Sequence, residues 1–341
     1  MTATQTTGEA GRLTSPFGWE QHCCLPVQAE ADIAPLRRYL DAGVSYLSVN
    51  VGFAPHDLDA SMRVVSSWRR QILLSSEPFA LVSTVDDMLA AQQQGRLVVG
   101  FDLEDTNPLG GEIAMIQAYY DLGVRSMLMT YNTENLAGFG CHAPHDSGLT
   151  SFGRAVVEEM NRVGMVVDVS HCGYRTSMDA LEHTASPAIF SHSNMRSVWD
   201  HDRNIRDDQA RACAATGGVI GINGVGIFLG DNDISVQAMA RHIDYAVELV
   251  GPRHVGIGTD YVFDTNDLEL ELANSQVFPA SYRSGPQTDF FPPEQLAPLE
   301  AELTSRGYPA ADIAAIMGGN FLRVAREVWK PAGGTPDSSA N

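Results

Sequence analysis

Short hydrophobic runs and amphipathic stretches alternate along this chain from about residue 44 onward. Each run has the length and β-branched character of a strand, and the stretches between the runs repeat their apolar positions with the helical period. Such alternation predicts successive βα units and a parallel sheet. The eight runs that we expect to be strands cover residues 44–52, 79–84, 96–104, 124–132, 165–171, 187–193, 218–224 and 254–261.

Eight units without a linker between them favour one α/β domain, a (β/α)₈ barrel of the TIM type. The length of 341 residues fits such a barrel, or about two domains of roughly 150 residues each. An open doubly wound sheet is the alternative, but it would leave two edge strands, and every run here is apolar. We expect a single barrel domain over 15–330, between flexible tails at 1–14 and 331–341.

The C-terminal part of the chain departs from this rhythm. Residues 262–293 are rich in Asp, Asn, Ser and Pro, and we interpret them as a long loop after the eighth strand. In a barrel such a loop lies over the active face. Two more helical patterns follow at 292–307 and 309–329, and we expect both to pack against the outside of the barrel.

The amino-acid composition restricts the kinds of molecule that this chain is expected to bind. The chain has 22 Lys and Arg against 42 Asp and Glu, and a formal net charge of −20 disfavours nucleic acid and anionic membranes. No secretory leader pattern and no run of roughly 18 apolar residues occurs, so we expect a cytoplasmic protein. Five cysteines without CxxC spacing predict reduced thiols. The expected partner is a small-molecule substrate, and a homodimer is left open.

Polar side chains stand at or near the C-terminal ends of five different predicted strands. A barrel collects its catalytic groups at these ends. A single polar residue there can simply face solvent, but five together indicate an active site. The five are Glu104, Tyr131, His171, His192 and Asp260.

Two of these residues have the chemistry of a metal site. His171 and His192 lie one βα unit apart, so their imidazoles can converge on one ion. Glu104 can add an oxygen ligand, and this set leaves a position open for water, as a catalytic zinc requires. Asp102 and Asp168, each two or three residues before a strand-end group, are expected to point less directly into the barrel mouth.

Two charged residues suggest how a substrate is handled. Arg203, in HDRNIRDD, offers a cationic fork to a substrate carboxylate, or else pairs with Asp207 or Asp208 of the next helix. Asp260, at the end of VGIGTD, can exchange a proton with the metal-bound water or the leaving amine, or can be only a structural acceptor.

Several longer segments resemble the membrane (renal) dipeptidase family, metallopeptidase family M19. They include LGVRSMLMTYNTEN, GLTSFGRAVVEEMNRVGMVVDVSH, SPAIFSHSNMRSVWDHDRNIRDD and HIDYAVELVGPRHVGIGTDY, and they follow one another between residues 97 and 329. The resemblance implies a (β/α)₈ barrel that holds two zinc ions and hydrolyses dipeptides. By this resemblance Glu104 is the metal-bridging glutamate, and His171 and His192 bind one zinc. Arg203 grips the substrate carboxylate, and Asp260 shuttles the proton.

Two positions depart from the family pattern. The family has an HxD pair on its N-terminal strand that binds the other zinc, whereas QHCCLP places His22 on the histidine and Cys24 on the aspartate. A thiol must lose its proton before it binds zinc, so we expect this second site to be weak or empty. Tyr131 stands where many members have a histidine that contacts the substrate carbonyl, and its phenol can donate a hydrogen bond to a developing oxyanion.

We therefore predict a zinc-dependent metallo-dipeptidase that hydrolyses the amide bond of dipeptides with metal-activated water. One zinc ion is expected, and a second is left open. Two alternatives stay open beside this prediction. One is a hydrolase of a non-peptide amide or a modified amino-acid conjugate, which the altered N-terminal motif and Tyr131 favour. The other is a non-catalytic relative that binds ligand without turnover.

Overall fold

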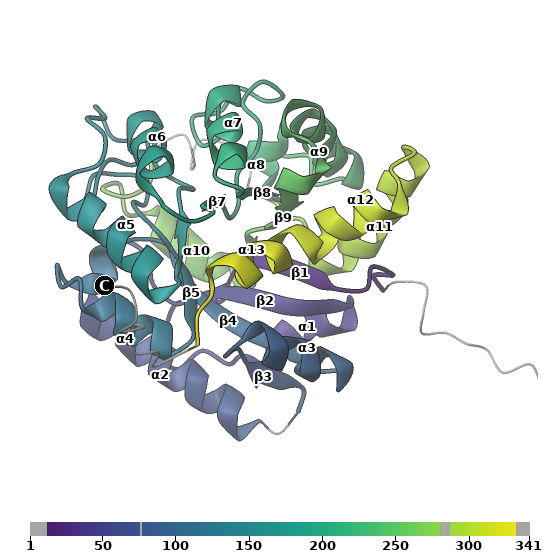
Figure 1. The fold of residues 1–341 in the computed structure, drawn as a ribbon, viewed down its shortest axis with the longest axis horizontal. Coiled ribbons are helices and arrows are strands. Elements are labelled where there is room, and N and C mark those ends of the chain that lie inside the picture. Colours follow the sequence, from purple (N-terminus) through teal and green to yellow (C-terminus); the bar gives the residue numbers. More distant parts are fainter. Residues whose placement is uncertain (1–11, 76, 280–281, 283–286, 332–341) are drawn as a thin grey trace, which may run out of the picture.

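The computed structural model describes residues 12–75, 77–279, 282 and 287–331 (Figure 1). Most of the tails expected at 1–14 and 331–341 lies outside the described residues. Within the predicted N-terminal tail, Leu13 is buried in the main core and the Thr14 N–H donates to Glu300 Oε2 at 2.7 Å.

The strands form one parallel sheet in the order β10-β1-β2-β4-β5-β6-β7-β8-β9. β9 and β10 are pieces of one segment; the first pairs with β8 and the second with β1, so the sheet returns on itself. The predicted barrel is thereby confirmed. The strands are β1 Gly18–Cys24, β2 Val44–Asn50, β3 Phe79–Leu81, β4 Leu97–Leu103, β5 Val124–Leu128, β6 Val166–Asp168, β7 Ile189–Phe190, β8 Val219–Ile222, β9 Val255–Ile257 and β10 Tyr261–Val262.

The hydrophobic pattern did not predict the first strand of the barrel, β1, which carries the segment matched to the N-terminal strand of the family. The run at 79–84 forms only the short strand β3, which pairs with β4 outside the circle, whereas β1 was absent from the eight runs. The sequence of β1, GWEQHCC, includes Glu20, Gln21 and His22, all of them buried. Because polar side chains fill this part of the barrel interior, β1 lacks the apolar pattern by which a strand is recognised.

Helices surround the sheet on its outer side (Figure 1). Local sequence explains their limits: in α5, for example, Thr150 accepts a hydrogen bond from the Gly153 N–H, and Gly164 ends the helix at a φ of 90°. The helices are α1 Arg37–Asp41, α2 Leu58–Leu74, α3 Val85–Gln93, α4 Met115–Asp121, α5 Ser151–Val163, α6 Tyr174–His183, α7 Asp207–Ala215, α8 Gly226–Leu229, α9 Val236–Val250, α10 Thr265–Leu272, α11 Leu296–Ser305, α12 Ala310–Ala314 and α13 Asn320–Val328.

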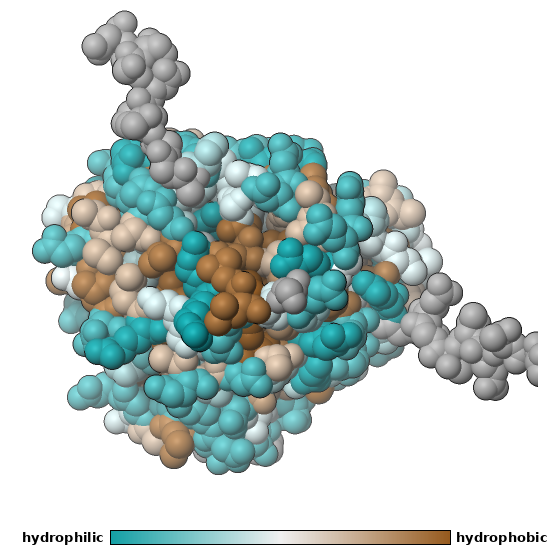
Figure 2. All heavy atoms as spheres, turned by 90° about the horizontal axis from the view of Figure 1, so that it is seen from below, coloured by the Kyte–Doolittle hydropathy of each residue, from teal (hydrophilic) through white to brown (hydrophobic). Residues whose placement is uncertain are grey.

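The surface between these helices is mainly hydrophilic on the face shown in Figure 2, where hydrophobic side chains gather in a smaller area. Among the described residues, no helix combines the length and the hydropathy that a membrane span needs.

Two expectations for the C-terminal part need correction. The segment 262–293 is not a plain loop, because it contains the helix α10. Acidic and apolar residues alternate in its sequence, TNDLELEL, so the pattern lacks the period by which a helix is recognised. Of the two last helical patterns, only the first packs outside as expected, where α11 contacts α9.

Helix α13 closes the N-terminal end of the barrel instead. Its Phe321 and Val324 pack with Trp19 of β1 and Tyr46 of β2 in a cluster of their own, made by residues near the starts of the strands. In Figure 1 this helix crosses in front of the strands. The opposite end of the barrel, where the strands end, is left for a site.

Candidate metal centre and active site

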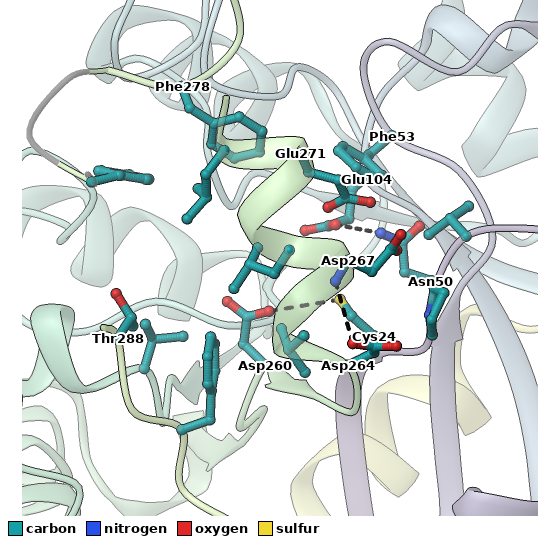
Figure 3. Close-up of a pocket in the computed structure, with 18 of the residues that line it drawn as sticks. Cys24, Asn50, Phe53, Glu104, Asp260, Asp264, Asp267, Glu271, Phe278 and Thr288 are labelled. Atoms are coloured by element: carbon teal, nitrogen blue, oxygen red, sulfur yellow. Dashed lines mark hydrogen bonds between the residues drawn. The ribbon is translucent and has the colours of Figure 1, made fainter. Parts of the chain in front are cut away.

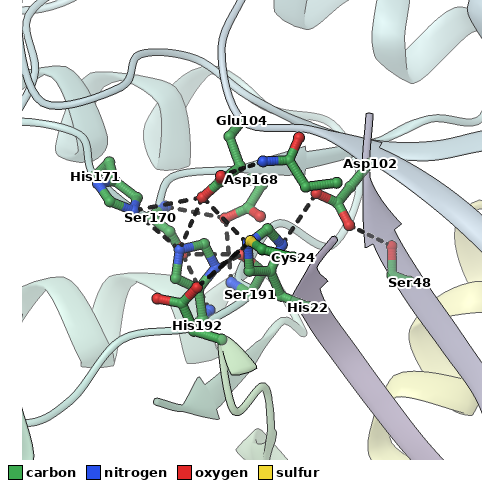
Figure 4. A network of polar contacts seen from close by, with 12 residues as sticks. His22, Cys24, Ser48, Asp102, Glu104, Asp168, Ser170, His171, Ser191 and His192 are labelled. Atoms are coloured by element: carbon green, nitrogen blue, oxygen red, sulfur yellow. Dashed lines mark hydrogen bonds and ion pairs between the residues drawn. The ribbon is translucent and has the colours of Figure 1, made fainter. Parts of the chain in front are cut away.

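Histidines from different strands meet at the C-terminal end of the barrel around Glu104 (Figure 4). Glu104 follows β4, and its Oε1 lies 3.2 Å from His22 Nε2, 3.5 Å from His171 Nε2 and 3.3 Å from His192 Nε2. The Nε2 atoms of His171 and His192 are 3.0 Å apart. The structure therefore brings the predicted pair and its carboxylate together, and adds His22.

The remaining nitrogens of the predicted pair are held by neighbouring side chains. His171 Nδ1 is 2.8 Å from Asn132 Oδ1, and His192 Nδ1 is 2.6 Å from Ser191 Oγ. Hydrogen bonds of this kind orient the imidazoles of metal-ligating histidines. They leave both Nε2 atoms directed at Glu104.

His22 has an orienting partner that sequence reasoning missed. Its Nδ1 lies 3.0 Å from Asp102 Oδ1, and Asp102 Oδ2 accepts a hydrogen bond from Ser48 Oγ at 2.6 Å. We expected Asp102 to point less directly into the mouth of the barrel, and it lies within β4, two residues before Glu104. Its closeness to His22 depends on the register between β1, β2 and β4, which a sequence pattern does not contain.

Cys24 reaches the same centre from the end of β1. Its Sγ lies 3.5 Å from His22 Nε2 and 3.9 Å from Asp260 Oδ1. Ligand atoms of two triads lie within 4.8 Å of one another, one from His22, Cys24 and Asp260 and the other from His22, Glu104 and His192. The proposed match of QHCCLP to the N-terminal motif is therefore compatible with the positions of both side chains.

The carboxylate of Asp168 binds backbone N–H groups. Its Oδ1 accepts hydrogen bonds from the N–H groups of Ser170 at 2.9 Å and Ser191 at 3.1 Å. These bonds tie the segment that carries His171 to the segment that carries His192. Asp168 Oδ1 thus supports the segments that carry the two histidines, while its Oδ2 has no hydrogen-bond partner among the described residues.

The backbone turns sharply at three residues of the centre. Asn132, His171 and Asp260 have φ values of 58°, 57° and 57°, in the left-handed region that side chains other than Gly rarely adopt. Such conformations persist where surrounding structure enforces them, and they gather at functional sites. Here they direct His171 and Asp260 toward Glu104.

Burial and neighbouring charge set the protonation of the centre. Burial raises the pKa of Glu104 to about 7, although His22 opposes this. Burial and the charge of Arg203 or His22 lower the pKa values of His171 and His192. Neutral imidazoles are the form that binds metal.

The pKa values of His22 and Cys24, the two residues of the N-terminal motif, are shifted by different causes. Burial alone would lower the pKa of His22, but the carboxylates of Asp102 and Glu104 raise it well above its ordinary value. Burial raises the pKa of the Cys24 thiol, against the opposing effect of His22. Without a bound cation Cys24 is therefore a thiol.

Asp260 lies at the rim between β9 and β10. Its Oδ2 accepts a hydrogen bond from Asn223 Nδ2 at 3.0 Å, and its Oδ1 is 3.6 Å from His22 Nε2. Burial raises the pKa of this carboxyl. Asn223, which follows β8, is a further site residue that sequence reasoning missed.

Arg203 is buried beside the centre. Its Nη1 donates to Ser193 Oγ at 2.9 Å and its Nη2 to the His192 carbonyl at 2.7 Å. The alternative ion pair with Asp207 or Asp208 does not form; the side-chain hydrogen bonds to these carboxylates come from hydroxyl groups instead. Arg203 Nε has no hydrogen-bond partner among the described residues.

Tyr131 covers one side of the histidine pair. Its ring stacks on His171 with centroids 4.2 Å apart, and its backbone N–H donates to Asp105 Oδ2 at 2.9 Å. The side chain is 8% exposed. It lines a pocket of about 780 Å³ that opens over the centre and is also bordered by Glu104 and Asp260.

Comparison with known proteins identifies relatives of this barrel. The family model described as membrane dipeptidase, peptidase family M19, matches residues 30–280. An uncharacterised dipeptidase of Schizosaccharomyces pombe is 33% identical over 57% of this chain and 48% of its own length. Dipeptidase 3 of Rattus norvegicus is 30% identical over 84% of this chain and 56% of its own. The chain thus spans about half the length of these curated relatives.

A solved structure supports the same fold. An amidohydrolase from Pseudomonas aeruginosa superposes with a TM-score of 0.84 and 25% identity, over 92% of this chain and 96% of the other.

Proposed function

Because the chain belongs to the membrane dipeptidase family, peptidase family M19, we propose that it is a zinc-dependent dipeptidase that hydrolyses the amide bond of dipeptides. One observation carries the proposal: three imidazole Nε2 atoms lie within 3.5 Å of a single carboxylate oxygen, that of Glu104. Such a set of donors favours a metal cation between them.

The donors suit zinc. Zinc is bound in proteins by imidazole nitrogen, thiolate sulfur and carboxylate oxygen. His171, His192 and Glu104 would hold one ion, and His22 and Cys24, with Glu104 shared, would hold a second. When bound, a zinc ion lowers the pKa of the attacking water and polarises the scissile carbonyl.

Side chains at the C-terminal rim of the barrel would transfer the proton and bind the substrate. Asp260 takes the proton of the attacking water and passes it to the leaving amine. The amide of Asn223 holds one of its oxygens, at 3.0 Å, and leaves the other directed at the centre. Arg203 pairs with the substrate carboxylate, and the Tyr131 hydroxyl donates a hydrogen bond to the carbonyl oxygen as negative charge develops there.

A second candidate is a hydrolase of a non-peptide amide or of a modified amino-acid conjugate. Cys24 at the place of the family aspartate, and the high structural similarity to an amidohydrolase, favour it. A non-catalytic relative is the third. A cytoplasmic location and a homodimer stay predictions from the sequence.

The test combines metal content with turnover. Purified protein is analysed for zinc and then incubated with a panel of dipeptides and, separately, N-acyl amino acids, before and after chelation. We expect free amino acids from the dipeptides, loss of this activity on chelation and its recovery with zinc. Asp260→Asn should retain zinc and lose turnover. Hydrolysis of the N-acyl compounds alone would favour the second candidate, and zinc without any turnover would favour the third.

A further inference from the structure

One wall of the pocket over the centre is acidic. Helix α10 borders the pocket, and Figure 3 shows Asp264, Asp267 and Glu271 along it, near Cys24 and Glu104. Residues spaced by three and four positions share one face of a helix. The acidic face of α10 is thus turned toward the place where we propose that substrate binds.

The three carboxylates differ in what they contact. Asp264 caps α10 by accepting from the N–H groups of Asn266 and Asp267. Asp267 Oδ1 accepts a hydrogen bond from Gln28 Nε2 at 3.0 Å. The carboxylate of Glu271 makes no hydrogen bond or ion pair with any described residue, and the charges that act on it, those of Asp267 and Glu104, are both negative. Glu271 is therefore the carboxylate that a ligand could neutralise.

A second, independent feature of the pocket also calls for a ligand. Tyr131 is 8% exposed and lines the same cavity, and its hydroxyl has no hydrogen-bond partner in the described part of the chain. A hydroxyl that lines a cavity without a protein partner can donate a hydrogen bond to a ligand there. The hydroxyl and Glu271 are polar points beside the apolar part of the lining.

That apolar lining suits a long side chain. Phe53, Leu268, Leu272 and Phe278 border the pocket beside Glu271. Lysine and arginine bury their methylene stems along apolar surface and keep their charged ends on a polar partner. These apolar side chains lie on the same side of the pocket as Glu271, so a stem that packs on them can carry its charged end to the carboxylate.

We propose that this pocket selects dipeptides with a cationic side chain, lysine or arginine, whose charged end pairs with Glu271. The inference rests on the proposed dipeptidase function and adds its substrate class. The cationic end of the side chain places a positive charge beside the Glu271 carboxylate, whose charged neighbours are both negative. The aliphatic stem lies on the apolar part of the lining.

The test compares matched substrates and matched variants. Lys-Ala and Ala-Lys are set against norleucyl-alanine and alanyl-norleucine, which keep the α-amino group and nearly the same stem but lack the side-chain charge. We expect kcat/KM for lysine to exceed that for norleucine about 10- to 100-fold at one of the two positions. Glu271→Gln should reduce this ratio to about threefold or less. Glu269→Gln removes the same charge from an exposed position of α10 that does not line the pocket, and should keep the ratio.

Two results would overturn the inference while leaving the dipeptidase function intact. One is equal kcat/KM for lysine and norleucine at both positions, and the other is a lysine preference that Glu271→Gln does not change. If no dipeptide is hydrolysed, the proposed function fails, and calorimetric titration with free lysine and free norleucine decides the inference by itself. Tighter binding of lysine that is lost in Glu271→Gln supports it, and equal binding of the two amino acids refutes it.

Discussion

At the residue scale, the N-terminal motif distinguishes the two halves of the proposed centre. His171 and His192 already have the protonation that a metal needs, because burial keeps both imidazoles neutral. Cys24 does not, since burial raises the pKa of its thiol. The two halves should therefore bind zinc with different strength.

Zinc titration of metal-free protein tests this difference. We expect one tight equivalent that Cys24→Ser does not affect, and a second that binds more weakly. Because the thiol must lose its proton, the second equivalent should bind more tightly as pH rises from about 6 to 9. Two equally tight equivalents, reduced to one by Cys24→Ser, would contradict the prediction.

Arg203 allows a second prediction at this scale. Loss of a charge-assisted contact to the substrate carboxylate costs on the order of 2–4 kcal/mol, so Arg203→Ala should lower kcat/KM about 30- to 1000-fold. A dipeptide amidated at its C-terminus is the control, because it lacks the carboxylate and should be cleaved by variant and wild type at similar rates. An equal loss on both substrates would indicate a structural role instead.

At the element scale, α10 carries a carboxyl that should destabilise the fold at high pH. Burial and the charges of Asp267 and Glu104 raise the pKa of Glu271 to about 8. The folded state therefore holds this proton more strongly than the unfolded state. Its contribution to stability is present below the unfolded pKa, near 4.5, and is lost as pH rises toward 8.

Denaturant unfolding at pH 5 and pH 8 checks this sign. Glu271→Gln should leave the free energy of unfolding nearly unchanged at pH 5 and raise it relative to wild type at pH 8, on the order of 2 kcal/mol. Glu269→Gln is the matched control and should show no such difference. A variant that is less stable than wild type at pH 8 would contradict the prediction.

Helix α13 is the element farthest from the proposed chemistry. Phe321 is 2% exposed and packs with Trp19 at the N-terminal end of the barrel. Phe321→Ala should lower the free energy of unfolding by about 3–5 kcal/mol, because it removes a buried aromatic ring and leaves a cavity. In the folded variant kcat/KM should stay within about threefold of wild type. A large loss of kcat/KM without loss of stability would mean that the two ends of the barrel are coupled.

At the scale of the whole molecule, the barrel explains how much the sequence could predict. Parallel strands end at one rim, so the strand-end residues Glu104, His171, His192 and Asp260 could be grouped from their positions in the sequence. The hydrophobic pattern missed β1 because the interior side chains of this strand are polar, and it missed α10 because acidic and apolar residues alternate there. The partners of the site residues, such as Asp102 for His22, depend on strand register and could not be predicted from pattern alone.

The central claim is that this barrel is a metal-dependent dipeptidase whose centre is built on Glu104. The most direct measurement uses protein from which a chelator has removed the metal. The rate of dipeptide hydrolysis is followed as zinc is added back, in wild type and in the His171→Ala, His192→Ala double variant. We predict that wild-type activity rises with zinc and saturates at one or two equivalents per chain, while the double variant retains less zinc and stays inactive. Hydrolysis that persists in chelated protein, or equal activity and zinc content in the double variant, would contradict the claim.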